Sequence, residues 1–216
     1  MTKLLVATGY RSGALASVEV VNLDESNPDY ICDNLPDFPF SIRFATGQLY
    51  NRKTPIICGE IGGSYHCECQ SLKDGAWQSM QNLNECRYAL ASALFSNPNN
   101  NEDDDILLIT GGYDRSTTLS TVESFDGNLW NQTMFADLPT TIGLHCMVKI
   151  NNTMLLQIGG TIDNIYPGTI DKTYFFDIIQ NKWIAGPKLN VGRIYHSCAV
   201  MNWMNPNTDS VEKVSY

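Results

Sequence analysis

The sequence predicts an all-β repeat protein, in which similar four-stranded units follow one another along the chain. Two sets of residues recur at a nearly fixed distance. Glycine pairs stand 49 and 48 residues apart, and tryptophans stand 53 and 53 residues apart: Gly62-Gly63, Gly111-Gly112, Gly159-Gly160, Trp77, Trp130 and Trp183. A period of this size marks a repeat architecture. Sixteen Gly, nine Pro and many Asn and Asp residues supply the turns that short strands need.

The stretch from Ile106 to Trp130 shows one unit most clearly. An apolar strand over 106–110 precedes the Gly111-Gly112 pair, and a strand of alternating character over 122–125 follows a polar loop. An Asp-Gly turn then separates this strand from the tryptophan, and Asp-Gly is a strong hairpin signal because both central positions favour positive φ. We therefore expect four strands in each unit. The first is followed by the strand that ends in glycine, which we call the glycine strand. The third strand has alternating character and the fourth carries the tryptophan.

The repeats extend over the whole chain as a single domain, 1–216. We place their boundaries at approximately 4–36, 43–83, 87–139 and 142–189, with a partial repeat over 193–216. Met80, Leu83, Arg87, Leu90 and Leu94 also fit helical spacing. The register of the repeats instead puts a strand start at Arg87, and we prefer that interpretation.

Composition and charge exclude several classes of function. The formal net charge is −9, so the surface repels nucleic acid and anionic membranes. No apolar run approaches the ~20 residues that cross a bilayer, so we expect no membrane insertion. The apolar run that begins at Leu4 ends at Gly9, which is too short for a signal peptide. We interpret it as a strand.

Packing explains why glycine and tryptophan recur. A lone four-stranded sheet cannot bury both faces, so the units must stack face to face around an axis. Near the axis glycine removes side-chain bulk and permits a sharp bend. On the wide outer strand, tryptophan fills the gap where neighbouring sheets splay apart.

These residues resemble the kelch repeat over almost the whole chain. The matching positions are the three glycine pairs, the three tryptophans, the leucine after each tryptophan, and Arg43, Arg87 and Arg193. The resemblance implies a β-propeller, usually of five to seven blades, and usually a platform for protein interaction. Departures are the missing second glycine and tryptophan of the first repeat, Gly59-Glu60 upstream of the second pair, and Ile142 in place of arginine.

The predicted fold is thus a kelch-type β-propeller with four blades and the first strand of a fifth. Such rings are commonly closed by a split blade, so a strand over 193–201 could pair with 4–8 and make a four-bladed ring. The chain stops before a fifth glycine strand. We therefore favour an arc of a longer protein.

Seven cysteines and two glycosylation sequons bear on the compartment. Cys67 and Cys69 face the same way in a strand, so only one can easily pair inward, and Cys58 on the adjacent strand is its candidate partner. Cys146 and Cys198 lie on equivalent strands and form a second candidate pair. The sequons at Asn131 and Asn151 fit secretion. We lean toward an extracellular location; the alternative is buried free thiols in the cytoplasm.

Candidate catalytic and metal sites are weak. His66-Cys67-Glu68-Cys69 lacks the second ligand pair of a zinc site. His145 and Cys146 point to opposite faces of a strand, and His196 and Cys198 occupy a repeat position, which favours packing over nucleophilic chemistry. The acidic run 102–105 lacks the spaced oxygens of a calcium loop. We expect no catalytic residue, metal or cofactor.

The loops after the glycine strands are the candidate binding surface, because every one contains a tyrosine. Tyrosine and arginine are enriched at binding hot spots, although tyrosine could also merely cap each blade. The candidate protein-binding residues are Tyr10, Arg11, Tyr65, His66, Tyr113, Asp114, Arg115 and Tyr166.

The resulting hypothesis is a non-catalytic scaffold that binds an unidentified protein through these loops. One alternative is a kelch-like enzyme of the copper-oxidase type, which needs a Tyr/His/Cys metal constellation; His66, His145 and His196 lie in three different repeats. Another is the substrate-recruiting module of a ubiquitin-ligase adaptor.

Overall fold

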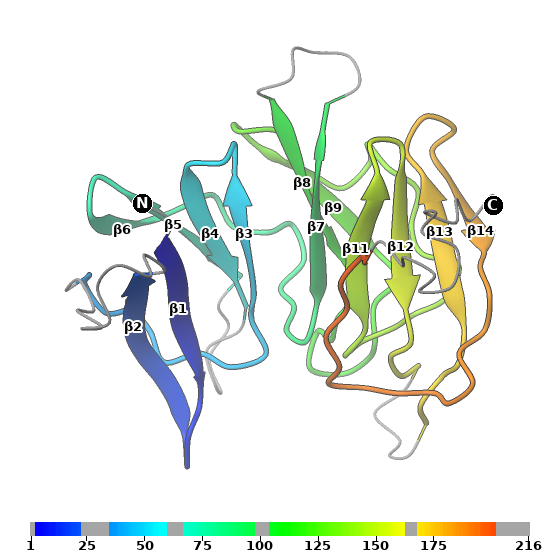
Figure 1. Cartoon of the computed structure of the whole chain (residues 1–216), viewed down its shortest axis with the longest axis horizontal. Coiled ribbons are helices and arrows are strands. Elements are labelled where there is room, and N and C mark those ends of the chain that lie inside the picture. The colour runs from blue at the N-terminus through cyan, green and yellow to red at the C-terminus, as the bar shows by residue number, and fades with distance from the viewer. Residues whose placement is uncertain (1–2, 23–34, 60–66, 98–103, 163–167, 202–216) are drawn as a thin grey trace, which may run out of the picture.

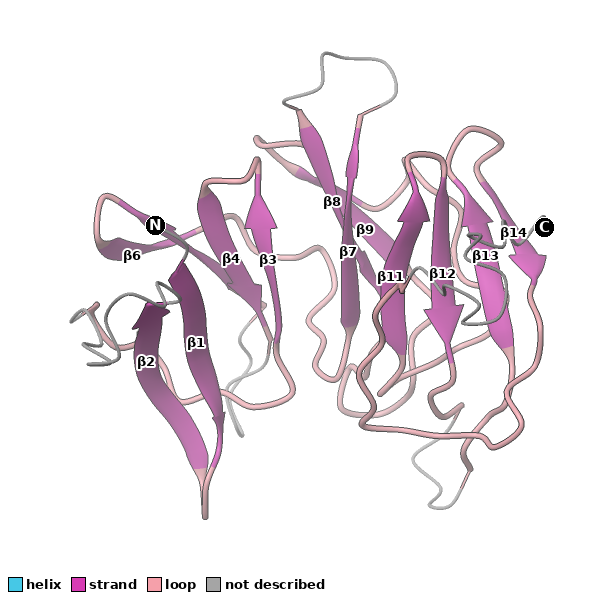
Figure 2. Ribbon diagram, in the orientation of Figure 1, coloured by secondary structure: helices cyan, strands magenta, loops and turns pink. Residues whose placement is uncertain are grey.

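The computed structural model describes residues 3–22, 35–59, 67–97, 104–162 and 168–201. These residues form fourteen strands and no helix (Figures 1 and 2). The strands are β1 (Lys3–Tyr10), β2 (Ala14–Asn22), β3 (Thr46–Tyr50), β4 (Thr54–Cys58), β5 (Cys69–Lys73), β6 (Ala76–Ser79), β7 (Ala91–Ser96), β8 (Asp105–Thr110), β9 (Val122–Phe125), β10 (Trp130–Asn131), β11 (Cys146–Asn151), β12 (Met154–Ile158), β13 (Thr173–Asp177) and β14 (Lys182–Ala185). The predicted all-β class is confirmed.

The strands make four antiparallel sheets in chain order. The first sheet is the β1–β2 hairpin, and the second, third and fourth sheets are β3–β6, β7–β10 and β11–β14. In each four-stranded sheet consecutive strands are neighbours, as the repeat predicted. In Figure 1 the glycine strands β1, β4, β8 and β12 all run toward the lower end of the molecule. The inner strands β3, β7 and β11 start from that end.

The three tryptophans occupy equivalent places. Each pairs across the outer hairpin with a large apolar residue, in the pairs Leu72 with Trp77, Phe125 with Trp130, and Phe176 with Trp183. The indole N–H of Trp77 donates to the carbonyl of Pro36 at 3.0 Å, and that of Trp183 donates to Ala136 at 2.9 Å. Both acceptors lie in the segment that follows the preceding sheet. These tryptophans therefore tie neighbouring sheets together at their outer side.

The leucine after each tryptophan is also held in a repeated way. The amides of Leu83, Leu138 and Leu189 donate to the carbonyls of Cys67, Ser120 and Asp171, close to the start of the third strand of their own sheets. In the first sheet the corresponding bond runs from Phe38 to Ala16. Phe38 thus closes the first unit, two residues beyond the boundary predicted at residue 36.

Backbone hydrogen bonds join each glycine strand to the next unit. The amides of Gly9, Gly112 and Gly160 donate to the carbonyls of Ile42, Ile142 and Arg193, at 3.1, 2.8 and 2.8 Å. A four-residue segment begins at each of these acceptor residues, and an equivalent segment precedes the third sheet. We call these four segments the lead-ins: 42–45, 87–90, 142–145 and 193–196. Residue three of each lead-in has positive φ, namely Phe44, Ala89, Leu144 and Tyr195.

This register corrects one element of the kelch resemblance. The second-repeat equivalent of Arg87 and Arg193 is Ile42, which is buried, and Arg43 stands one residue later. The side chains of Arg87 and Arg193 each donate through Nε to the carbonyl two residues earlier. Arg43 therefore has a different role from the other two arginines.

Conformation and space both explain the glycine pairs. Gly111 and Gly112 have φ of 54° and 97°, and Gly159 and Gly160 have φ of 59° and 105°. A Cβ on Gly112 would lie 2.6 Å from the Tyr88 carbonyl, where real side chains do not fit. In the first sheet Thr8 takes the first position of the pair with φ of 65°. In the second sheet Gly59 follows β4 as Gly111 follows β8, whereas Gly62-Gly63 lies outside the described residues.

Hydrophobic side chains fill the spaces between the sheets. Strand β8 serves two of these layers because alternate residues face opposite sides. Leu107 and Ile109 pack toward the second sheet, while Ile106 and Leu108 pack toward the fourth. A smaller cluster around Phe38, Ile42 and Ile57 joins the first and second sheets.

The prediction of a strand over 193–201 is wrong, and the strand predicted to start at Arg87 starts instead at Ala91. Residues 193–201 form no strand and do not pair with β1, whose only neighbouring strand among the described residues is β2. This segment is held instead by the bond from the Gly160 amide to the Arg193 carbonyl and by the disulfide between Cys198 and Cys146. The helical alternative for 80–94 is also absent, and β7 begins at Ala91.

A buried ion pair fixes the lead-in of the third sheet. The Arg87 guanidinium donates to Glu123 Oε1 on β9 at 2.8 Å, and both side chains are fully buried. Arg87 also donates to the carbonyls of Gly111 and Thr121. The Glu123 carboxylate accepts bonds from the amides of Asn84 and Glu85 as well. The network thus satisfies both buried charges and anchors the glycine strand to the lead-in.

We expect Glu123→Ala to lower the free energy of unfolding by about 3–5 kcal/mol, because it leaves the Arg87 charge buried and unpaired. Urea denaturation measures this. Glu19→Ala is the matched control, since Glu19 is the equivalent residue of the first sheet and is exposed. Its effect should stay within roughly 0.5 kcal/mol. Equal effects of the two variants would contradict the structural role of the network.

Candidate aromatic binding surface

Aromatic side chains from several units gather where the lead-ins meet the glycine-strand ends. We call this group the aromatic cluster: Tyr10, Arg43, Phe44, Tyr88, Tyr113 and Tyr195. Tyr10 ends β1, Tyr113 follows β8, and the other members belong to three lead-ins. All these elements meet at the lower end of Figure 1. The cluster therefore draws on the first three sheets and on the segment after the fourth.

Ring contacts connect the members. The Arg43 guanidinium carbon lies 5.6 Å from the Tyr10 ring centroid and 5.2 Å from that of Phe44. The Phe44 ring lies 5.9 Å from Tyr195 and 6.4 Å from Tyr88, centroid to centroid. Tyr88 stacks on Tyr113 at 5.4 Å. Cation–π and offset aromatic contacts at these distances are attractive, so the rings hold one another in place.

Exposure singles out this cluster. Among the described residues, the exposed aromatic side chains are Tyr10 at 63%, Phe44 at 39% and Tyr195 at 66%, and all three belong to the cluster. Arg43 is exposed beside them. Exposed aromatic rings next to an arginine have the composition of a binding hot spot. The arrangement offers stacking surface and one positive charge to a ligand.

The predicted binding residues divide into three groups. Tyr10 and Tyr113 belong to the cluster, but Tyr113 is buried at 4% exposure and its ring packs against Gly143 of the next lead-in. Arg11 and Arg115 are exposed in the loops beside it. Tyr65, His66 and Tyr166 lie outside the described residues.

Asp114 shapes its own loop. Its Oδ1 accepts bonds from the amides of Ser116 and Thr117 and from the Ser116 hydroxyl, each at 2.9 Å. These bonds to Thr117 and Ser116 lower the pKa of Asp114. The carboxylate thus orders the loop that carries Arg115, which has a φ of 91°.

Sequence reasoning missed four members of the cluster: Arg43, Phe44, Tyr88 and Tyr195. It examined the loops after the glycine strands but not the lead-ins. The signal was available in part, because an aromatic residue follows an arginine within two positions at three lead-ins. The positive φ that turns Phe44 and Tyr195 out of the strand direction could not be foreseen, since such values are uncommon for bulky residues.

Three disulfides involve six of the seven cysteines, and Cys32 lies outside the described residues. Cys146 is bonded to Cys198, which ties the last lead-in segment to β11. Cys58 is bonded to Cys69 directly across β4 and β5. Cys67, a candidate partner of Cys58, is instead bonded to Cys86. The structure is thus compatible with an extracellular location.

Of the two histidines near these cysteines, His145 is buried and His196 is half-buried. Because Cys146 and Cys198 are bonded to each other, neither offers a thiol. His145 is buried, and its Nε2 lies 2.9 Å from the Thr110 hydroxyl. Burial lowers the pKa of His145 to about 3, with a smaller contribution from His196 nearby. Burial also lowers the pKa of His196, as does Arg193.

No cluster of three or more His, Cys, Asp or Glu side chains is arranged to hold a metal ion in the described part of the chain. The same residues include no helix long and apolar enough to cross a membrane. Comparison of the sequence with protein-family models and with curated proteins gives no match.

Stability should fall as the pH is lowered from about 6.5 toward 3, because unfolding releases His145 to take up a proton. The slope can approach the ~1.4 kcal/mol per pH unit of one titrating group. Denaturant midpoints across this range test it. His145→Leu introduces the residue type that Leu90 provides at the equivalent position, and it should flatten much of the slope. The remaining slope is due to His196 and, toward pH 3, to Asp114, whose pKa values are also lowered. An unchanged slope would contradict neutral burial of His145.

Proposed function

We propose that this chain is a non-catalytic protein-binding module whose contact surface is the aromatic cluster. The observation that carries the proposal is that every exposed aromatic side chain of the described residues belongs to this one group. Isolated exposed apolar residues are ordinary, but a contiguous exposed set marks an interaction site. Rings that already contact one another lose little freedom on binding, which favours affinity.

The fold that best accounts for this surface is a kelch-type β-propeller, present here as an arc of successive blades. Support comes from the sequence resemblance, from sheets with the same strand order, and from hydrogen bonds that recur at equivalent positions. In a propeller the glycine-strand loops and the lead-ins share one end, so a partner could contact several blades at once. This end surface is where we place the partner.

We propose an extracellular location for the protein. The three disulfides support it, because such bonds persist in oxidising compartments and are rare in the cytosol. The partner is then a secreted or cell-surface protein. The exposed Arg43 in the cluster, with Arg11 in the loop beside it, favours a partner whose contact surface carries acidic groups.

The triple variant Tyr10→Ala, Phe44→Ala, Tyr195→Ala should lose its partner, because it removes the exposed rings. Alanine is tolerated at the positive φ of Phe44, since Ala89 has the same conformation in the third sheet. Affinity capture from extracellular fluid, with the immobilised protein as bait, measures the set of bound proteins. We expect at least one protein bound by the unaltered chain to be lost.

The control is Ile179→Ala combined with Val191→Ala, two exposed apolar residues outside the cluster. This control should retain the same proteins as the unaltered chain. Circular dichroism of all three baits verifies that they are folded. Identical captured sets for all three would rule out the cluster as the contact surface.

A further inference from the structure

The first sheet differs from the others on the side of its glycine strand. In the second, third and fourth sheets the glycine strand lies between an inner strand and the third strand. Among the described residues β1 is paired with β2 alone, so no described strand lies at its inner edge. An edge of this kind presents a row of unpaired N–H and C=O groups that can accept another strand.

The inner strands also form a row. Strand β3 contacts β7, and β7 contacts β11, so neighbouring inner strands pack against each other. The described part of this row ends at β3, on the side that faces the first sheet. The place that an inner strand of the first sheet would occupy is therefore beside both β1 and β3.

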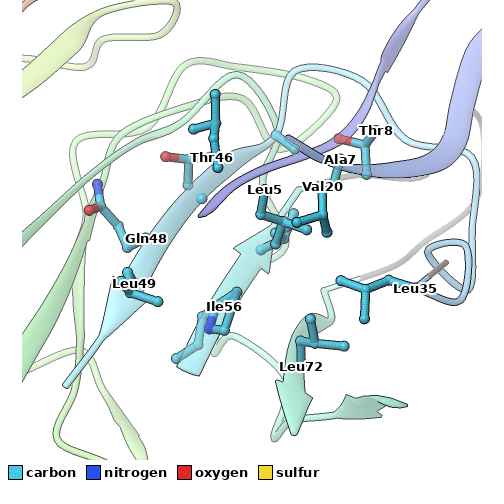
Figure 3. Close-up of a pocket in the computed structure, with 15 residues that line it drawn as sticks. Leu5, Ala7, Thr8, Val20, Leu35, Thr46, Gln48, Leu49, Ile56 and Leu72 are labelled. Atoms are coloured by element: carbon cyan, nitrogen blue, oxygen red, sulfur yellow. The ribbon is translucent and has the colours of Figure 1, made fainter. Parts of the chain in front are cut away.

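A groove of about 630 Å³ lies at this place. Figure 3 shows Leu5 and Ala7 of β1 on one side and Gln48 and Leu49 of β3 on the other, with Ile56 of β4 between them. All the side chains that line the groove are uncharged, and most are aliphatic. Leu49 is 51% exposed although it faces the groove. An uncharged, largely apolar occupant would bury this surface favourably.

We propose that this groove binds an extended, uncharged segment of another polypeptide, which adds to β1 as an antiparallel strand. The antiparallel direction follows from the three inner strands of this chain, all of which pair in that way with their glycine strands. Main-chain hydrogen bonds to β1 supply affinity, and alternate side chains enter the groove. The site is separate from the aromatic cluster and does not depend on its function.

A single strand fits better than a second copy of this chain. If β1 paired with β1 of another copy, β2 of that copy would come with it. Two strands would then lie on the inner side of β1, where every other sheet has one inner strand. Residues 193–201 are also unavailable, because Cys198 is bonded to Cys146 on β11. The occupant is therefore one strand wide, about five or six residues long, as β3, β7 and β11 are.

The test uses a fluorescent peptide with the sequence of residues 89–97, ALASALFSN, which contains inner strand β7 and carries two added lysines for solubility. Fluorescence polarisation measures its binding to the whole chain. We expect saturable binding that is lost when proline replaces two consecutive central residues, because both edges of the peptide then lack a donor. Equal binding of the proline peptide would overturn strand addition.

Leu49→Asp places a charge in the groove and should weaken peptide binding at least tenfold. Leu129→Asp is the matched control, because Leu129 is similarly exposed at 53% and does not line the groove. Equal affinities of the two variants would overturn the site. Absence of peptide binding overturns it too. In that case sedimentation identifies the occupant. A dimer that Leu49→Asp dissociates would show that a second copy fills the groove. A monomer that Leu49→Asp destabilises would show that another part of this chain fills it.

Discussion

One hydrogen bond, repeated from unit to unit, governs the arrangement of this protein. A glycine amide at the end of the glycine strand donates to the carbonyl that opens the next lead-in, at Gly9, Gly112 and Gly160. The bond requires close approach of two backbones and positive φ on the donor side, which glycine provides without strain. Tryptophan indoles and hydrophobic layers add contacts farther out. The bond between the glycine amide and the lead-in carbonyl fixes where each sheet begins relative to the preceding sheet. The tryptophan and hydrophobic contacts therefore depend on it.

The candidate binding surface is a consequence of the same constraint. Once the carbonyls of Ile42 and Arg193 are fixed, the chain turns through positive φ at Phe44 and Tyr195 before the next strand position. Side chains at these turns do not follow the alternation of a strand, and the Phe44 ring meets the rings of Tyr88 and Tyr195 in other lead-ins. The Tyr10 ring meets Arg43 of the next lead-in, as Tyr113 meets Gly143. Residues that connect the units thus also present aromatic rings to solvent.

The sequence predicted the elements better than the contacts between them. Strand order, the Asp-Gly turns and the equivalence of the tryptophans followed from spacing, because side-chain periodicity and turn chemistry are local. Gly62-Gly63 was matched to the other pairs by composition, whereas strand register puts Gly59 at that place. Arg43 was similarly aligned one residue out of register with Arg87. Cys67 bonds to Cys86 across a loop, a pairing that strand alternation could not reveal. Tyr10 was found as a binding candidate, but Phe44 and Tyr195 required the backbone conformation of the lead-ins.

Hydrogen exchange of individual backbone amides tests the repeated inner bond most directly. If the bonds from Gly112 and Gly160 join the units, these two amides should exchange as slowly as those of the buried strand β8, because opening them requires neighbouring sheets to separate. Two-dimensional NMR spectra recorded after transfer to heavy water give the rates. Exchange of Gly112 and Gly160 as fast as the amides of the exposed turn at Asp126 and Gly127 would contradict the account.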